Sequence, residues 1–115
     1  MTEYIKKKVT LGNSIRYVKY SEASPGDVLV VGTYTGSEQV PSYQNKAVLV
    51  PLHNFEDEDG KIVKMNGADQ LNRMLSTIAV GTMVEIIFLG KDKFKTKDGK
   101  IRFIINFEVN ELEEA

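Results

Sequence analysis

The chain has 115 residues, of which 42% are hydrophobic, and its formal net charge is −1. This length suits one domain, and the absence of cysteine excludes disulfides, thiolate nucleophiles and cysteine-ligated zinc. No apolar run approaches the roughly 18 residues of a membrane span, and the first residues lack the apolar stretch of a signal peptide. We therefore expect a cytoplasmic protein that does not contact a membrane.

The first half of the chain alternates β-branched runs with turn residues. Residues 1–25 are interpreted as an N-terminal extension that contains a short leading strand. Gly32 interrupts a β-branched run and indicates a bend or bulge. His53 opens a polar, acidic loop at 53–60 and is expected to be solvated there. Strand-like runs are predicted over residues 15–20, 28–36, 43–52 and 61–65.

The period of the apolar residues then changes from two to between three and four. Ala68, Leu71, Leu75 and Ile78 share one face of an expected helix of about three turns, with Asn66 or Asp69 as its N-terminal cap.

Residues 84–109 are predicted to form a long β-hairpin. Asp98-Gly99 is typical of a type I′ turn, whose two central positions need positive φ. In the second strand of the hairpin, one face is expected to point into the core, with Phe103 and Phe107 buried. That face consists of Ile101, Phe103, Ile105, Phe107 and Val109.

The order of these elements predicts an all-β fold with one helix. Three strands, a helix and a two-stranded hairpin follow one another, as in the five-stranded Greek-key OB-fold barrel, where the helix lies between the third and fourth strands. We expect a single OB-fold domain over residues 1–110, followed by a short acidic end at 111–115.

Basic charge is concentrated in the predicted hairpin. Four lysines recur there with period two, which places their ammonium groups on one side of a strand and Phe94 on the other. Lysines around an aromatic ring suit binding of a phosphate chain with stacking of a base. The alternative is a solvated edge hairpin whose lysines discourage edge-to-edge pairing. The four lysines are Lys91, Lys93, Lys95 and Lys97.

Catalysis and metal binding have little support in the sequence. No phosphate loop, nucleophile motif or metal signature is present, and the carboxylates of residues 56–59 lack the spacing of a calcium loop. We therefore expect a protein that is not an enzyme and has no cofactor.

Nucleic-acid binding has better support, because cations and flat side chains fall where an OB-fold groove would lie. Tyr34 and Tyr43 flank the loop between the first two strands of the barrel, although each is as readily a half-buried strand residue. The candidate nucleic-acid-binding residues are Arg16, Tyr34, Tyr43, Lys46, Lys91, Lys93, Phe94, Lys95, Lys97, Lys100 and Arg102.

The acidic end offers a second candidate surface. Its carboxylates could occupy the basic groove or bind a partner protein, or they could form a plain solvated terminus. The candidate partner-binding residues are Glu111, Glu113 and Glu114.

The chain resembles the small OB-fold single-stranded-DNA-binding proteins of bacteriophages. The resemblance rests on three stretches: Lys64-Met-Asn-Gly-Ala-Asp-Gln-Leu-Asn-Arg-Met-Leu75, Val80-Gly-Thr-Met-Val-Glu-Ile86 and the lysine hairpin. The chain departs from the family in lacking tryptophan and in its weak acidic tail.

The resemblance implies a protein of DNA replication, recombination or repair that binds single strands with little sequence preference. It would act in the host cytoplasm if a phage encodes it, with replication or recombination proteins as further partners through the acidic C-terminus. The sequence leaves the oligomeric state open, with a homo-oligomer among the alternatives. A protein-interaction module of OB-like fold is the alternative function, and an RNA-binding barrel is a third.

Overall fold

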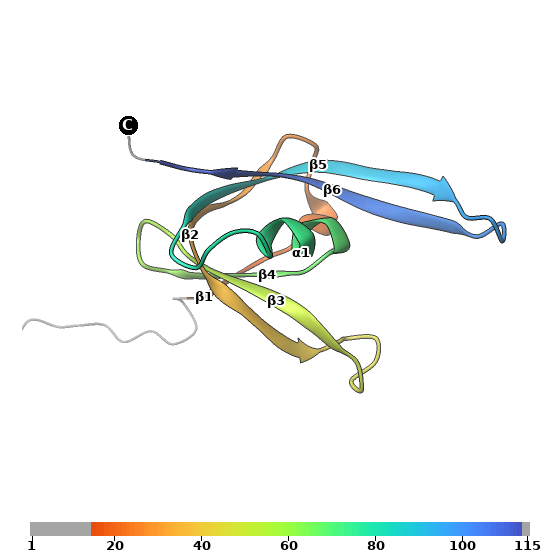
Figure 1. Cartoon of the computed structure of the whole chain (residues 1–115), viewed down its shortest axis with the longest axis horizontal. Helices are drawn as coiled ribbons and strands as arrows, with labels where there is room; N and C mark the ends of the chain where they lie inside the picture. Colours follow the sequence, from red (N-terminus) through yellow and green to blue (C-terminus); the bar gives the residue numbers. More distant parts are fainter. Residues whose placement is uncertain (1–14, 114–115) are drawn as a thin grey trace, which may run out of the picture.

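The computed structural model describes residues 15–113 and consists mainly of strands (Figure 1). One short α-helix lies between the fourth and fifth strands, where the sequence predicts it. No helix within the described range is long and apolar enough to cross a membrane. The elements are β1 (Ile15–Val18), the 3-10 helix η1 (Tyr20–Glu22), β2 (Val28–Pro41), β3 (Leu49–Glu56), β4 (Ile62–Asn66), α1 (Asp69–Leu75), β5 (Met83–Lys95) and β6 (Ile101–Glu111).

The strands form one six-stranded sheet in the order β1-β4-β3-β2-β5-β6. The expectation of five strands is therefore incomplete, because the leading strand β1 joins the sheet edge. It pairs in parallel with β4, from Ile15 opposite Ile62 to Val18 opposite Met65. The other pairs are antiparallel.

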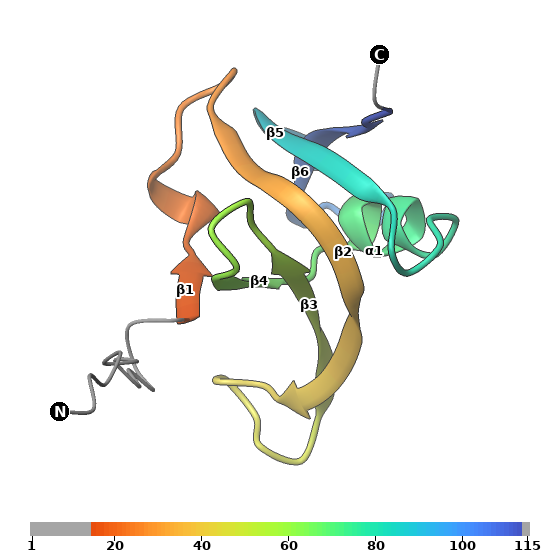
Figure 2. The ribbon, with the colours of Figure 1, turned by 90° about the vertical axis from the view of Figure 1, so that its left-hand side faces the viewer.

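Strand β2 curls the sheet into a half-barrel, which is visible in Figure 2. Its first part pairs with β5 and its second part with β3, and the two pairings meet at Thr33. At Gly32 a Cβ atom would lie 2.6 Å from the backbone oxygen of Glu56, so only glycine allows this close approach. The register shifts on either side of Gly32, and Gly36 adopts a φ of 128° at the second shift. The predicted bend is therefore present as two irregularities that flank the glycine.

Helix α1 is shorter than the sequence suggests, with seven residues. Its N-cap is Ala68, which makes no side-chain capping bond, so the prediction of Asn66 or Asp69 as the cap is wrong. Leu71 and Leu75 are fully buried in the core. The helix contacts β6, which is one of the two edge strands of the sheet.

The core lies inside the curl, around Phe55 and Phe107. The burial of Phe107 agrees with the prediction from the sequence. Phe103 and Ile101 do not join it, because their exposed fractions are 60% and 64%. The predicted apolar face of β6 is therefore core only from Ile105 onward.

Candidate nucleic-acid interface

The outer half of the β5–β6 hairpin, residues 89–104, projects from the body of the molecule and is called the arm here (Figure 1). β5 and β6 have 13 and 11 residues, whereas typical strands have about 5–6. The barrel core needs only the inner half of each strand. The side chains of the outer half are therefore left to solvent.

The turn at the tip of the arm differs from the predicted type I′ turn. Gly99 N donates to Thr96 O at 3.0 Å, and Thr96 N donates to Lys100 O at 2.8 Å. Gly99 has a φ of 82°, whereas Asp98 has a negative φ. This pattern is that of a type I turn followed by a glycine in the left-handed region. Because β5 ends at Lys95, Lys97 and Lys100 lie in this turn and not on the strand.

Three lysines line one face of the arm: Lys91, Lys93 and Lys95, called the lysine row here. They stand opposite Ile105, Phe103 and Ile101 of β6, respectively. Residues directly opposite each other share a face, so a row of ammonium groups runs beside a row of apolar side chains. Lys93 Nζ lies 5.9 Å from the centre of the Phe103 ring, within the range of a cation–π contact.

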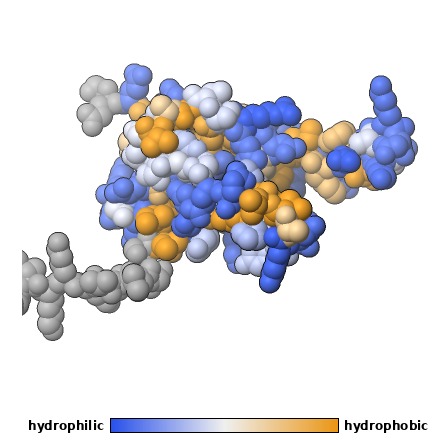
Figure 3. Space-filling view, turned by 60° about the horizontal axis from the view of Figure 1, so that its bottom comes forward, coloured by the Kyte–Doolittle hydropathy of each residue, from blue (hydrophilic) through white to orange (hydrophobic). Residues whose placement is uncertain are grey.

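The opposite face of the arm carries the second exposed phenylalanine. Phe94 is 42% exposed and stands opposite Arg102. Beside them, Asn106 Nδ2 donates to Asp92 Oδ2 at 2.7 Å. Mixed hydrophobic and hydrophilic surface marks the arm at the right-hand end of Figure 3. The arm therefore offers one cation and one aromatic ring on this face as well.

A second candidate surface is a groove of about 700 Å³. Tyr17 of β1 and Tyr43 of the β2–β3 loop lie at its edge with exposed rings, and Lys19 and Lys64 add positive charge. Its apolar lining includes Val40, Val50 and Leu52. An apolar floor with exposed rings and ammonium groups suits a flat base attached to a phosphate.

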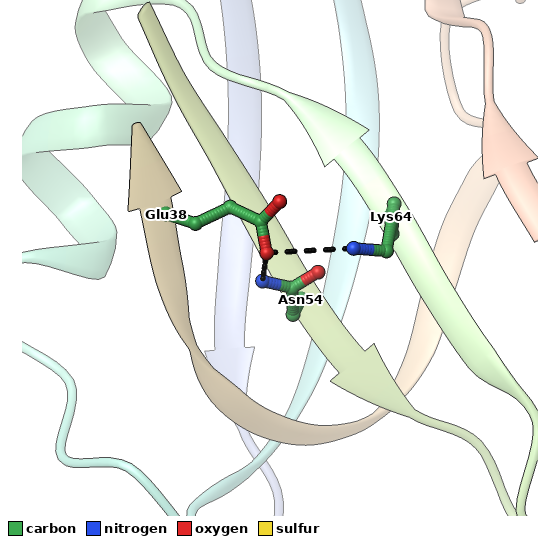
Figure 4. A network of polar contacts seen from close by, with 3 residues as sticks. All are labelled: Glu38, Asn54 and Lys64. Atoms are coloured by element: carbon green, nitrogen blue, oxygen red, sulfur yellow. Dashed lines mark hydrogen bonds and ion pairs between the residues drawn. The ribbon is translucent and has the colours of Figure 1, made fainter. Parts of the chain in front are cut away.

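One of the groove lysines is partly neutralised (Figure 4). Lys64 Nζ lies 3.4 Å from Glu38 Oε2, and Asn54 Nδ2 donates to the same oxygen at 3.2 Å. These three side chains come from adjacent strands, β4, β2 and β3. Lys19 and the tyrosine rings are therefore the stronger binding groups of the groove.

The structure separates the residues that the sequence proposes as one site. Tyr34 is 7% exposed and packs on Phe55, with ring centres 5.6 Å apart, so it belongs to the core and offers no stacking face. Arg16 lies on β1, where Nη2 donates to Leu29 O at 3.4 Å. Tyr43 and Lys46 are exposed in the β2–β3 loop, on a different hairpin from the arm.

The acidic end lies far from the tip of the arm. β6 begins at the tip with Ile101 and ends with Glu111 at the other end of the hairpin (Figure 1). At roughly 3.3 Å per residue, its length separates the two by about 30 Å. Leu112 N donates to Met83 O at 2.8 Å and ties the chain to the start of β5. Glu113 is exposed, and Glu114 lies outside the described residues.

His53 is part of β3 and is 3% exposed, so the expectation of a solvated loop residue is wrong. Its Nε2 lies 2.7 Å from Asn72 Oδ1, and its Nδ1 lies 2.6 Å from Ser37 Oγ, which also bonds the Tyr34 hydroxyl. A neutral ring that donates from Nε2 and accepts at Nδ1 satisfies this chain. Burial lowers the pKa of His53, and the hydrogen bond with Asn72 opposes that shift.

No group of three His, Asp or Glu side chains that could hold a metal ion is found among residues 15–113. The carboxylates of residues 56–59 therefore do not form such a group. Asp57 Oδ1 instead accepts from the backbone N–H groups of Asp59 and Lys61 and stabilises its own turn.

Three exposed residues of the candidate surfaces were not predicted as site residues from the sequence: Tyr17, Lys19 and Phe103. Tyr17 and Lys19 lie in or beside a strand treated as an extension of the barrel. Phe103 continues the apolar alternation of the core. The length of the predicted hairpin could have indicated that Phe103 is exposed, because strands this long extend beyond a small core.

Comparison of the chain with models of known protein families, with curated proteins and with solved structures finds no match.

Proposed function

We propose that the protein is a non-catalytic single-stranded-DNA-binding protein that acts in replication, recombination or repair. The observation that carries this proposal is the lysine row beside the exposed ring of Phe103. Ammonium groups in a row neutralise phosphates, and an exposed ring stacks on a base, so together they suit an unpaired strand.

The fold supports the proposal through its order of elements. β2 to β6 follow one another as the five strands of an OB-fold would, with α1 between the third and fourth of them and a strongly bent first strand. In this interpretation β1 is an addition to the sheet edge. The Greek-key OB barrel is part of the proposal.

The proposed mechanism uses the two candidate surfaces in different ways. Lys91, Lys93 and Lys95 contact consecutive phosphates, while Phe103 stacks on a base. The groove holds further bases between Tyr17 and Tyr43. None of these contacts reads a base edge, so we expect little sequence preference.

Titration of a fluorescent oligothymidine at several salt concentrations tests the proposal. Each phosphate contact contributes a slope of roughly 0.7 to the plot of log affinity against log salt, so the three lysines predict a slope of about 2. Lys93→Gln with Lys95→Gln should lower both affinity and slope. The matched control is Lys61→Gln, an exposed lysine in the β3–β4 turn, which should change neither. A flat salt response would contradict the electrostatic mechanism.

Competition between DNA and RNA oligomers of equal length tests the choice of DNA. Preference for RNA would favour the RNA-binding alternative.

A protein-interaction module is the second candidate, and the exposed Ile101 and Ile104 of the arm favour it, because apolar side chains contribute little to phosphate binding. Absence of oligothymidine binding at low salt would favour this candidate.

A further inference from the structure

Strand β6 is the last strand of the sheet, and its outer backbone edge has no strand partner within residues 15–113. Such an edge presents N–H and C=O groups in a row and is a template for pairing with another chain. Natural proteins usually protect long edges with charge, proline or a bulge. The outer half of β6 has little of this protection. It has one charged residue, Arg102, it has no proline, and the bulge of the hairpin lies on β5.

Two hydrogen bonds identify which residues of β6 point their backbone groups outward. Lys100 O accepts from Thr96 N across the hairpin, whereas Phe107 N is directed away from β5 to Gln70 Oε1 at 2.6 Å. Backbone direction alternates along an antiparallel strand. Even-numbered residues therefore bond β5, and Ile101, Phe103 and Ile105 point outward.

The free part of this edge has definite limits. The turn at 96–100 bounds it on one side, and Gln70 of α1 occupies the N–H of Phe107 on the other. Between these limits lie the outward groups of Ile101, Phe103 and Ile105.

We infer that β6 pairs with β6 of a second copy of this chain, antiparallel and centred on Phe103. A two-fold axis through Phe103 places Ile101 opposite Ile105 of the second copy and Phe103 opposite its own counterpart. All three outward residues then form hydrogen-bonded pairs, which amount to roughly six backbone bonds. Apolar side chains meet apolar side chains along this face.

Neighbouring registers are less favourable. A shift by one step toward the tip places Arg102 opposite Arg102 of the second copy, which sets like charges against each other. A shift toward the body places Ile101 opposite Phe107, whose N–H group is already bonded to Gln70. The register centred on Phe103 is the one that uses every free outward group.

The exposed apolar residues of the arm also favour a second copy of the chain as the partner of the β6 edge. Ile101, Phe103 and Ile104 are 64%, 60% and 43% exposed in the single chain. The self-complementary pairing covers part of their surface from both sides at once. It also joins two arms into one four-stranded platform with a lysine row along each outer strand, which doubles the surface proposed for DNA.

Sedimentation equilibrium and amide hydrogen exchange of the full chain without DNA test this inference. We expect a dimer at submillimolar concentration, with slowed exchange at Ile101, Phe103 and Ile105. In a monomer, slowed exchange would be confined to the intervening residues Arg102 and Ile104, which bond β5. A monomer at all concentrations, or a dimer with fast exchange at the three outward amides, would overturn the inference.

A proline variant provides the mutational test. Phe103→Pro removes the central outward N–H while leaving the bonds to β5, because proline is tolerated where the N–H faces away from the sheet. It should shift the mass to that of a monomer, whereas Phe103→Val, which keeps the N–H, should remain a dimer. Circular dichroism of both variants checks that they fold, and a Phe103→Pro variant that is folded and still dimeric would overturn the inference. Since no DNA is present, these results are independent of the proposed DNA binding.

Discussion

Phe103 was expected in the core and is exposed, whereas Tyr34 was a candidate for the binding surface and is buried. Phe103 continues the apolar alternation of β6, yet it lies on the arm, beyond the reach of the core. Tyr34 is predicted from the sequence to flank a loop, yet it lies within β2, where its ring packs on Phe55 and its hydroxyl bonds Ser37. Alternation along a strand indicates the face of a side chain, but it does not indicate whether that part of the strand is covered.

Phe103→Ala is expected to weaken binding of oligothymidine by about 1–3 kcal/mol, the range for one stacked base. Phe94→Ala is the matched comparison, since the same ring is removed from the face opposite the lysine row. We expect a smaller loss there, because fewer cations lie on that face to hold a phosphate chain near the ring. Fluorescence titration of both variants measures the difference. A larger loss for Phe94→Ala would place the DNA on the Arg102 face.

His53 predicts a pH dependence of stability. Burial lowers its pKa in the folded state below the value of about 6.5 expected in the unfolded chain. As the pH falls, the unfolded state therefore binds the proton first, and the free energy of unfolding decreases from about pH 6.5 down to the lower pKa of the folded state. Above about pH 6.5 this contribution is fully present.

Urea unfolding at about pH 7.5 and about pH 5.5 measures the effect, with His53→Gln as the comparison. The wild type should lose more stability between these two pH values than the variant, which retains amide hydrogen bonding but does not titrate. Equal losses would show that His53 is not responsible.

At the scale of elements, α1 covers part of the unpaired edge of β6. Gln70 Oε1 accepts from Phe107 N at 2.6 Å, and Gln70 Nε2 donates to Asn106 Oδ1 at 3.3 Å. Tyr20 of η1 adds an edge-to-face contact with the Phe107 ring, at 5.3 Å between centres. Gln70 of α1 therefore covers the edge of β6 near the core, η1 packs on the Phe107 ring, and the edge of the arm is left uncovered.

Gln70→Ala is expected to destabilise the fold by about 1–3 kcal/mol, because it leaves the partly buried N–H of Phe107 without an acceptor. Gln39→Ala is the control, since Gln39 is exposed on β2 and should change stability little. Denaturant unfolding measures both. A neutral Gln70→Ala would mean that water replaces the glutamine at this edge.

At the scale of the whole molecule, β6 separates basic and acidic charge. The lysine row and Arg102 lie on the arm, whereas Glu108 and Glu111 lie toward the other end of the strand. The strand is too long for the acidic end to reach the tip of its own arm. The sequence left open whether the acidic end competes with DNA for the lysines of the same chain. We therefore do not expect this competition at the arm.

Glu111→Gln combined with Glu113→Gln should leave the affinity for oligothymidine nearly unchanged from about 0.1 M salt upward. The physical reason is that charges separated by more than a Debye length, about 10 Å at 0.1 M salt, are largely screened. Titration across a salt series checks this expectation. Clearly tighter binding at about 0.1 M salt would indicate that the acidic end of one copy competes for the arm of another.

The sequence by itself determined the features that depend on neighbouring residues. The mainly β character, the helix between the fourth and fifth strands and the long hairpin follow from local alternation and turn residues, and all are present in the structure. The lysine period is present for Lys91, Lys93 and Lys95, whereas Lys97 lies in the turn. The type and order of these elements were predictable because each signal extends over only a few neighbouring residues.

Tertiary structure alone decided which alternating residues are covered. The junction of β1 with β4, the bond between His53 and Asn72 and the exposure of Phe103 each depend on segments far apart in the chain. Burial is a property of the whole packed core, whose extent no local period specifies. For this reason the lysines of the arm were identified from the sequence, whereas Lys19 of the groove was not, and the aromatic rings were identified only in part.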